Sequence, residues 1–336
     1  MAKNQIGKSY QVKHKIAVEH YLKTGMRFIL LRRWREDISN LWIEQYFADV
    51  DVEKLTNNKY NCITQYRKVL YFSIYDKETG KTQRLEKIGY VMALSTEQHL
   101  SSASFLDVDA IIFEEFMERG SYIPNEPYRL MVLYSTIDRK RGTTKLFMVG
   151  NSISRVCPYI KDWDLDRIFR KLKQGEIETK IIPTENMEIK IAIEYCMSSG
   201  GKSMTIGYGA KMVDSGEWQT FPQPKLPKSI NEYKRIFQFG FLYKGFKFLC
   251  DYLSDEDNGD LCFFIYPYYK EFSDDIIIFS DIIKPSELWQ RDIYNISIKN
   301  DKLKRFFQEF KENKIFYSDD LCGTDFKQVI DFVIRK

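Results

Sequence analysis

The sequence predicts an α/β protein with a mostly parallel sheet in its first domain and a smaller α+β second domain. In the first half, short apolar runs typical of buried strands alternate with segments of helical spacing, which favours a parallel sheet covered by helices. After a stretch rich in Gly, Ser and Pro, the pattern changes to a block of strands followed by two amphipathic helices. We therefore expect a first domain over residues 1–182, a linker with a small insert over 183–227, and a second domain over 228–336.

Composition narrows the class of protein. A chain of 336 residues is longer than one ordinary domain, which favours two domains. Its contents of 44% hydrophobic and 15% aromatic residues argue against disorder. Six cysteines without CxxC spacing and only three histidines make a zinc site improbable and favour reduced cytosolic thiols. The sequence has neither an uninterrupted apolar run that would span a membrane nor the apolar core of an export signal, so we expect no membrane partner.

The net charge of +4 does not by itself demand a nucleic acid partner. Basic clusters at residues 32–35, 139–141 and 167–173 could neutralise phosphates. Solvated helix and loop ends explain any single cluster equally well.

The elements of the first domain follow from apolar spacing and turn residues. Helical spacing begins directly after Gly7-Lys8-Ser9 and stops at Thr24-Gly25. The expected elements are a helix over 10–23, a buried strand over 28–31, a hairpin of strands 69–75 and 88–94 inserted on the core, a buried strand over 110–113, a helix from 125, and a strand over 145–149.

The second domain should open with two strands over 236–248 that turn at Tyr243-Lys244-Gly245. A further strand is expected over 261–266 after an acidic turn. Apolar residues at i, i+3, i+4 and i+7 predict helices around 303–310 and 326–333.

Gly7-Lys8-Ser9 is typical of the end of a phosphate-binding loop, the Walker A motif. Gly7 would let backbone N–H groups approach phosphate, Lys8 would reach the β- and γ-phosphates, and the Ser9 hydroxyl would bind Mg²⁺. The first Gly of the full pattern would fall at Ala2, and the strand that should precede the loop is missing, so a truncated chain is one explanation. A glycine at a helix start is the structural alternative, and the downstream segments favour the phosphate loop.

The buried strand at 110–113 ends in Glu114 and Glu115, the arrangement of a Walker B motif. Phosphoryl transfer needs carboxylates just past a strand end beside the phosphate loop. Glu114, where Asp is usual, would hold Mg²⁺, and Glu115 would polarise the attacking water. The alternative is a buried strand with a solvated acidic end.

Other polar residues follow the core strands and helices. Arg139 is our choice for an arginine that reaches a neighbour's phosphates, although a charged helix end explains it equally well. Asn151 could sense the γ-phosphate through its amide. Arg32, Arg33 and Arg35 could contact nucleotide, DNA or a neighbouring subunit, and structural roles are as plausible for all of them.

Two further patterns carry less weight. A second Gly-Lys-Ser at residues 201–203 lacks the upstream Gly and favours a flexible loop. The acidic residues between 251 and 281 could suggest two-metal nuclease chemistry, which needs three or four converging carboxylates. Most of them cluster in apparent turns, so solvated loops are favoured.

Taken together, these segments resemble the DNA-packaging ATPases of phi29-type short-tailed phages. The resemblance covers about residues 6–160, and Tyr-Ile-Pro-Asn-Glu is its least generic part. The matching residues are Ile6 to Tyr10, Phe28 to Arg33, Ile111 to Phe116, Tyr122 to Glu126, Gly150 to Ser152, and Pro158-Tyr159.

The resemblance implies a P-loop NTPase domain of the ASCE type, with ATP and Mg²⁺ as cofactors, and an RNase H-like C-terminal domain that lacks a nuclease active site. It implies a ring of five copies that docks from the host cytoplasm on a procapsid, held by a packaging RNA and the portal, and drives in double-stranded DNA. In that family the position of Arg139 matches an arginine offered in trans. Arg35 matches a lysine near the subunit interface.

The sequence thus favours an ATP-driven DNA translocase with ATP bound by Gly7, Lys8 and Ser9. Two alternatives stay open. One is a terminase-like protein whose second domain cuts DNA. The other is a non-catalytic nucleic-acid-binding assembly protein with a defective phosphate loop.

Overall fold

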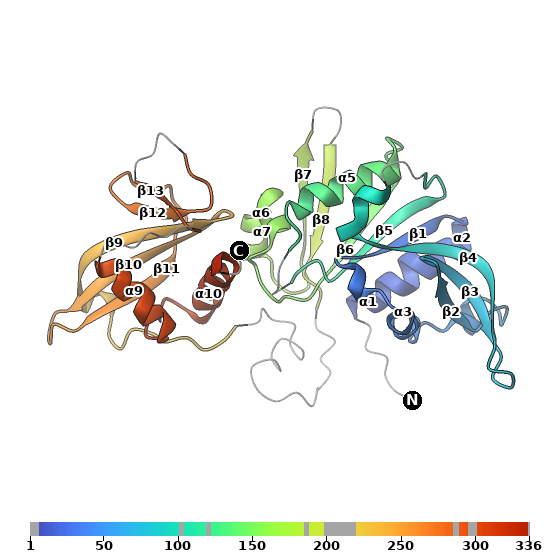
Figure 1. Cartoon of the computed structure of the whole chain (residues 1–336), viewed down its shortest axis with the longest axis horizontal. Coiled ribbons are helices and arrows are strands. Elements are labelled where there is room, and N and C mark those ends of the chain that lie inside the picture. The colour runs from blue at the N-terminus through green and yellow to red at the C-terminus, as the bar shows by residue number, and fades with distance from the viewer. Residues whose placement is uncertain are drawn as a thin grey trace. The chain divides into compact units, whose positions relative to one another are not determined.

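The chain forms two compact units (Figure 1). The computed structural model describes residues 7–100, 104–118, 122–184, 188–197, 220–284, 289–294 and 301–334. Of these, 7–153 and 172–197 lie in the first unit, and 154–171 and 220–334 lie in the second. The units therefore differ from the expected ranges, because segment 154–171 packs with the second unit, where Val156 joins the core. Ala2 and the second Gly-Lys-Ser lie outside the described residues.

The first unit is built on a six-stranded sheet in the order β2-β3-β4-β1-β5-β6. Strands β4, β1, β5 and β6 run parallel to one another, while β3 pairs antiparallel with both β2 and β4. The expected mostly parallel α/β sheet is therefore confirmed. The strands are β1 (Arg27–Arg32), β2 (Cys62–Tyr66), β3 (Val69–Tyr75), β4 (Thr82–Ala93), β5 (Val108–Glu114) and β6 (Lys145–Val149).

The expected hairpin is part of this sheet rather than an addition to it. Its second strand, β4, pairs in parallel with β1, with Leu30 opposite Val91. A Cβ on Gly89 would lie 2.7 Å from the carbonyl oxygen of Phe28, so only glycine allows the two strands to approach here. The hairpin therefore contributes a central strand.

Helices cover the sheet in the first unit. The first helix comprises α1 (Lys8–Gln11), a π-helical stretch η1 (Val12–Glu19) and α2 (His20–Thr24), and ends at Gly25 with φ of 72°. The other helices are η2 (Arg35–Asp37), α3 (Asn40–Phe47), α4 (Val52–Leu55), η3 (Leu94–Leu100) and α5 (Glu126–Asp138). Ala17 and Val18 pack with Phe28 and Leu30, which joins the first helix to the central strand.

An antiparallel hairpin of β7 (Ile177–Pro183) and β8 (Glu188–Glu194) belongs to the first unit. Strand β8 lies where we expected a linker with a small insert. The hairpin forms its own two-stranded sheet.

The second unit contains a six-stranded sheet in the order β13-β12-β9-β10-β11-β14. Strands β9, β10 and β11 are antiparallel, and the expected turn at Tyr243-Lys244-Gly245 joins β9 to β10. Three short strands were not expected. Strand β12 pairs in parallel with β9 and β13, and β14 pairs in parallel with β11. The strands are β9 (Tyr233–Tyr243), β10 (Phe246–Asp255), β11 (Leu261–Pro267), β12 (Ile277–Ser280), β13 (Gln290–Asp292) and β14 (Phe316–Tyr317).

The expected helices α9 (Asp301–Lys311) and α10 (Asp320–Ile334) pack on this sheet through aromatic rings. The ring centre of Phe306 in α9 lies 5.1 Å from that of Phe239, and the ring centre of Phe326 in α10 lies 5.0 Å from that of Phe241. The unit also holds η4 (Ile230–Glu232), α6 (Pro158–Asp162) and α7 (Asp166–Lys171). Across the described parts of both units, no helix is long and apolar enough to cross a bilayer.

Candidate active site

The carboxyl ends of parallel strands β1, β5 and β6 meet at one edge of the first sheet, and α1 begins there. The Ser9 hydroxyl donates to Glu114 Oε2 at 3.2 Å, although the two residues are 105 positions apart. Lys8 Nζ donates to the carbonyl oxygen of Gly150 at 2.8 Å. The glycine-lysine-serine segment and the glutamate pair therefore adjoin, as the sequence predicts.

Glu114 is buried, with 5% of its surface exposed. Its Oε1 accepts a hydrogen bond from the Tyr46 hydroxyl at 2.6 Å, while Oε2 accepts from Ser9. Burial raises the pKa of Glu114 above its usual value, and the two hydrogen bonds act against that shift. The carboxyl group is thus held in one orientation from two helices, α1 and α3.

Tyr46 is a site residue that sequence reasoning missed. It lies on α3, whose residues Trp42, Ile43, Tyr46 and Phe47 have helical spacing. That spacing could have revealed the helix. Its contact with Glu114 depends on how α3 packs on the sheet, which local pattern does not show.

The Lys8 ammonium lies in a partly buried position beside Gly150. Burial lowers the pKa of Lys8, and the neighbouring Cys196 and Glu114 oppose this shift. Asn151 is exposed and follows Gly150 directly, so the structure brings Asn151 to the Lys8 side of the edge. Gly7 has an extended backbone with φ of −82°, and a Cβ there would meet no atom within 4 Å. Only the approach of a ligand would require glycine at this position.

Glu115 has a left-handed backbone, with φ of 57°, and its carboxylate has other partners than that of Glu114. Its side chain is 59% exposed, and Oε2 lies 2.7 Å from Arg32 Nη2. The Arg32 guanidinium also lies 4.8 Å from the centre of the Trp42 ring. Adjacent glutamates therefore have different surroundings, one buried between helices and one ion-paired at the surface.

The other arginines after β1 differ in exposure. Arg33 is only 2% exposed and is bound by Glu126, so contact with nucleotide, DNA or a neighbour is excluded for its side chain in this conformation. Arg35 is exposed on η2. In the described part of the chain, Arg35 makes no hydrogen bond or ion pair with Lys8 or Ser9.

Arg139 lies at the other edge of the sheet. Helix α5 runs back from the carboxyl ends of the strands and ends at Arg139, which has φ of 47°. Two residues later, Arg141 donates to the carbonyl oxygens of Leu106 and Val108, at the start of β5. The structure therefore does not bring Arg139 to Lys8 or Glu115 of its own chain.

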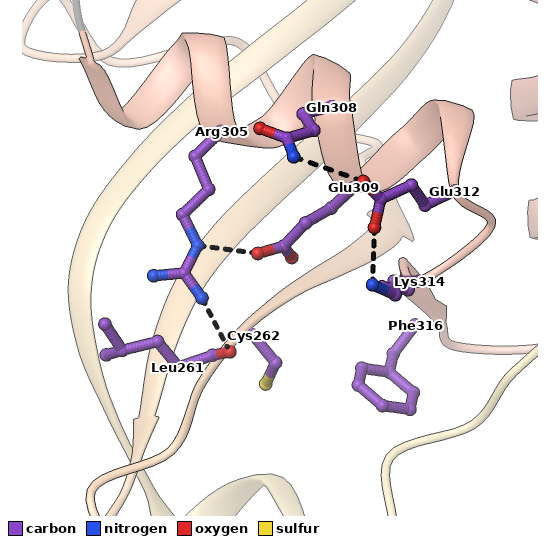
Figure 2. A pocket seen from close by; sticks show the side chains of 8 residues that line it. All are labelled: Leu261, Cys262, Arg305, Gln308, Glu309, Glu312, Lys314 and Phe316. Carbon is purple, nitrogen blue, oxygen red and sulfur yellow. Dashed lines mark hydrogen bonds and ion pairs between the residues drawn. The ribbon is translucent and has the colours of Figure 1, made fainter.

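The second unit holds a pocket of about 590 Å³ between α9 and the edge of its sheet (Figure 2). Its polar side chains pair with one another: Arg305 donates to Glu309 Oε1 at 2.6 Å, and Lys314 pairs with Glu312. Within the described residues, no three His, Cys, Asp or Glu side chains gather in a way that could hold a metal ion. The acidic residues between 251 and 281 thus form no visible metal cluster.

The fold and site define an α/β protein with a lysine and a serine at the start of a helix, beside two glutamates at the carboxyl end of a parallel strand. The chain belongs to the family of podovirus DNA encapsidation proteins (Gp16), whose family model matches residues 1–178. This confirms, for the family, the resemblance seen in the sequence.

Similar proteins agree with this assignment. The chain is 31% identical over 180 residues to the DNA packaging protein of Bacillus phage B103, covering 52% of this chain and 50% of that protein. It is 29% identical over 163 residues to the DNA packaging protein of Bacillus phage phi29, covering 48% and 44%. The chain thus spans about half the length of the curated relatives it matches. The fold is similar to that in the bacteriophage phi29 viral genome packaging motor assembly, with a TM-score of 0.56 at 20% identity, over 98% of this chain and 92% of that one.

Proposed function

We propose that the protein is an ATP-driven double-stranded DNA translocase of a phage packaging motor. The single observation that carries this proposal is the 3.2 Å contact between Ser9 and Glu114 in a member of the DNA encapsidation family. A hydroxyl at a helix start and a carboxylate at a strand end are the pair that P-loop enzymes use for Mg²⁺ and triphosphate.

In the proposed site, the phosphates bind at the amino end of α1, over Gly7, Lys8 and Ser9. Lys8 exchanges its bond to the Gly150 carbonyl for a phosphate oxygen. Ser9 and Glu114 supply hard oxygen ligands that suit Mg²⁺, which keeps several waters and needs few protein ligands. When bound, Mg²⁺ would neutralise charge on the phosphates. Asn151, beside Gly150, would donate its amide to the γ-phosphate, and Arg35 would contact the nucleotide or the next subunit.

Glu115 would act as the general base that orients and deprotonates the attacking water. Its carboxylate is paired with Arg32 in this structure, so that pair must open or shift before the carboxylate can accept the water's proton. Arg139 would stabilise the transferred phosphoryl group of a neighbouring copy, because its position excludes that role in its own chain.

The remaining parts of the proposal come from the family resemblance. A ring of five copies would dock from the host cytoplasm on the procapsid, through a packaging RNA and the portal. The second unit would be an RNase H-like domain without nuclease activity that binds nucleic acid through backbone charge.

Replacing Glu115 tests the chemistry directly. In E115Q we expect DNA-stimulated ATP turnover to fall by roughly 10²- to 10⁴-fold, as for the loss of a general base. Nucleotide affinity should stay within about twofold, since Glu115 lies beyond the phosphate-binding residues. The exposed Glu78 in the β3–β4 turn supplies a matched control, E78Q. Turnover by E115Q equal to that of an active parent protein would refute the catalytic assignment of Glu115, whereas a parent protein without ATP turnover would favour the non-catalytic assembly role.

A further inference from the structure

Arg33 is a buried arginine between two elements of the first unit. It follows β1 directly and is 2% exposed, and its main partner, Glu126, is the first residue of α5 and 1% exposed. Arg33 Nε lies 3.0 and 2.9 Å from the two carboxylate oxygens of Glu126. The pair joins the central strand to the start of the helix after the glutamates.

The other nitrogens of this guanidinium bind the backbone at the proposed general base. Nη1 donates to the carbonyl oxygen of Glu115 at 3.2 Å, and Nη2 donates to that of Phe116 at 2.7 Å. The group also lies 4.7 Å from the centre of the Tyr122 ring. One side chain thus holds two successive carbonyl groups just past the end of β5.

The backbone at this point needs such support. Glu115 adopts φ of 57°, a conformation that a residue with a Cβ seldom adopts without help from its surroundings. The conformation of this residue decides where the Glu115 carboxylate lies relative to the end of β5. The planar guanidinium can bind a carboxylate on one edge and carbonyl groups on another, which a lysine ammonium cannot reproduce.

Glu126 keeps the guanidinium in place. Its Oε2 also accepts a hydrogen bond from the backbone N–H of Ile123 at 2.8 Å. A buried ion pair is a weak source of stability, because desolvation offsets most of the attraction. The value of this pair therefore lies in the geometry that it imposes.

We infer that Arg33 is a positioning residue for Glu115 and that Glu126 positions Arg33, an inference that rests on the proposed function. Arg33 holds the left-handed turn at Glu115 through the carbonyl groups of Glu115 and Phe116, and so sets the direction in which the Glu115 side chain leaves the backbone. Because Arg33 and Glu126, which we call the clamp, are both buried, they would act on the site through the backbone rather than by contact with nucleotide.

The test is R33K in the full chain, which keeps a positive charge beside Glu126 but removes the planar guanidinium that binds the two carbonyl groups. We expect kcat for ATP to fall by roughly 10- to 100-fold, while KM for ATP changes less than about threefold, because phosphate contacts are untouched. Hydrogen exchange of the Phe116 amide, which donates to the Val149 carbonyl, should become at least several-fold faster. The matched control is R27K, at the opposite end of the same strand in an ion pair with Asp107.

Y122F provides a milder variant in case R33K does not fold. It keeps the ring beside Arg33 and removes the hydroxyl that bonds to the backbone of Glu118. It should also lower kcat and speed exchange at Phe116, by a smaller factor. Unchanged kcat and unchanged exchange in both variants would overturn the inference.

Failure of the proposed function would look different. If E115Q is as active as the parent protein, the catalytic assignment is wrong whatever R33K does, and exchange at Phe116 still reports on the clamp. If E115Q is inactive while R33K has full activity and parental exchange, only the inference about Arg33 fails.

Discussion

The carboxyl group of Glu114 accepts hydrogen bonds from Ser9 on α1 and Tyr46 on α3. Burial raises its folded-state pKa, so folding favours the protonated form at low pH. The protonated carboxyl group therefore contributes to the free energy of unfolding at pH values below its ordinary pKa, and this contribution is lost as the pH rises through its pKa in the folded protein. Mg²⁺ binding has the opposite dependence, because the metal needs the carboxylate.

Replacing Tyr46 should therefore shift the pH dependence of metal binding. Y46F removes a hydrogen bond that lowers the pKa of Glu114, so the pKa rises further. We expect the acid limb of Mg²⁺-dependent nucleotide binding to move to higher pH, measured by titrating nucleotide binding from acid to neutral pH. Y128F, at an exposed tyrosine of α5, is the matched control. A profile identical to that of the parent protein would contradict the role of Tyr46.

At the scale of single residues, sequence predicts the groups that recur in motifs but not their tertiary partners. Lys8, Ser9, Glu114 and Glu115 follow from local pattern, and the contact between Ser9 and Glu114 follows from parallel strands. The pairing of Arg32 with Glu115 does not, since it depends on side-chain packing between two strand ends.

At the scale of elements, α10 carries a buried carboxyl group. Asp325 pairs with Arg155 of segment 154–171 at 2.8 Å, and burial raises the pKa of Asp325 to about 6. Its folded-state pKa lies above the ordinary 3.8, so its contribution to stability is present below about pH 4 and is lost as pH rises to about 6.

D325N should flatten this part of the stability profile. Between about pH 4 and pH 7, the parent protein should lose on the order of 3 kcal/mol more unfolding free energy than D325N, measured by urea denaturation. D331N, at an exposed position on the same helix, should retain the parent slope. Parallel profiles for D325N and the parent protein would show that Asp325 does not titrate as described.

Elements with a strong apolar pattern can be predicted from this sequence. Short elements, and elements that form only through contacts with distant segments, cannot. Strands β1, β5 and β6 and helices α9 and α10 match their patterns. Three strands of two to four residues, β12, β13 and β14, have too little pattern and form through pairing with distant strands. Segment 154–171 joins the second unit through Val156, a contact that no local signal shows.

At the scale of the whole molecule, the two halves of the proposed catalytic machinery lie at opposite edges of one sheet. Lys8 and Glu115 lie at the carboxyl ends of the strands, while Arg139 lies near the start of β5. A complete site would therefore need two copies of the chain. Most closed homo-oligomers are symmetric, so each copy could both give and receive an arginine.

Mixing two inactive variants tests this arrangement. R139A and E115Q should each lose most ATP turnover, the arginine contributing typically 10³-fold or more. Mixed together, they should regain activity, because one interface combines Glu115 of one variant with Arg139 of the other. E115Q mixed with K8A should stay inactive, since both residues belong to the same half of the site. No recovery in the first mixture would contradict the arrangement in trans.

The most direct measurement is an experimental structure of the protein with Mg²⁺ and a non-hydrolysable ATP analogue. We expect the β- and γ-phosphates to lie at the amino end of α1, with Lys8 moved from the Gly150 carbonyl to phosphate and Mg²⁺ near Ser9 and Glu114. A nucleotide bound elsewhere, with Lys8 still on Gly150 and Ser9 still on Glu114, would contradict it.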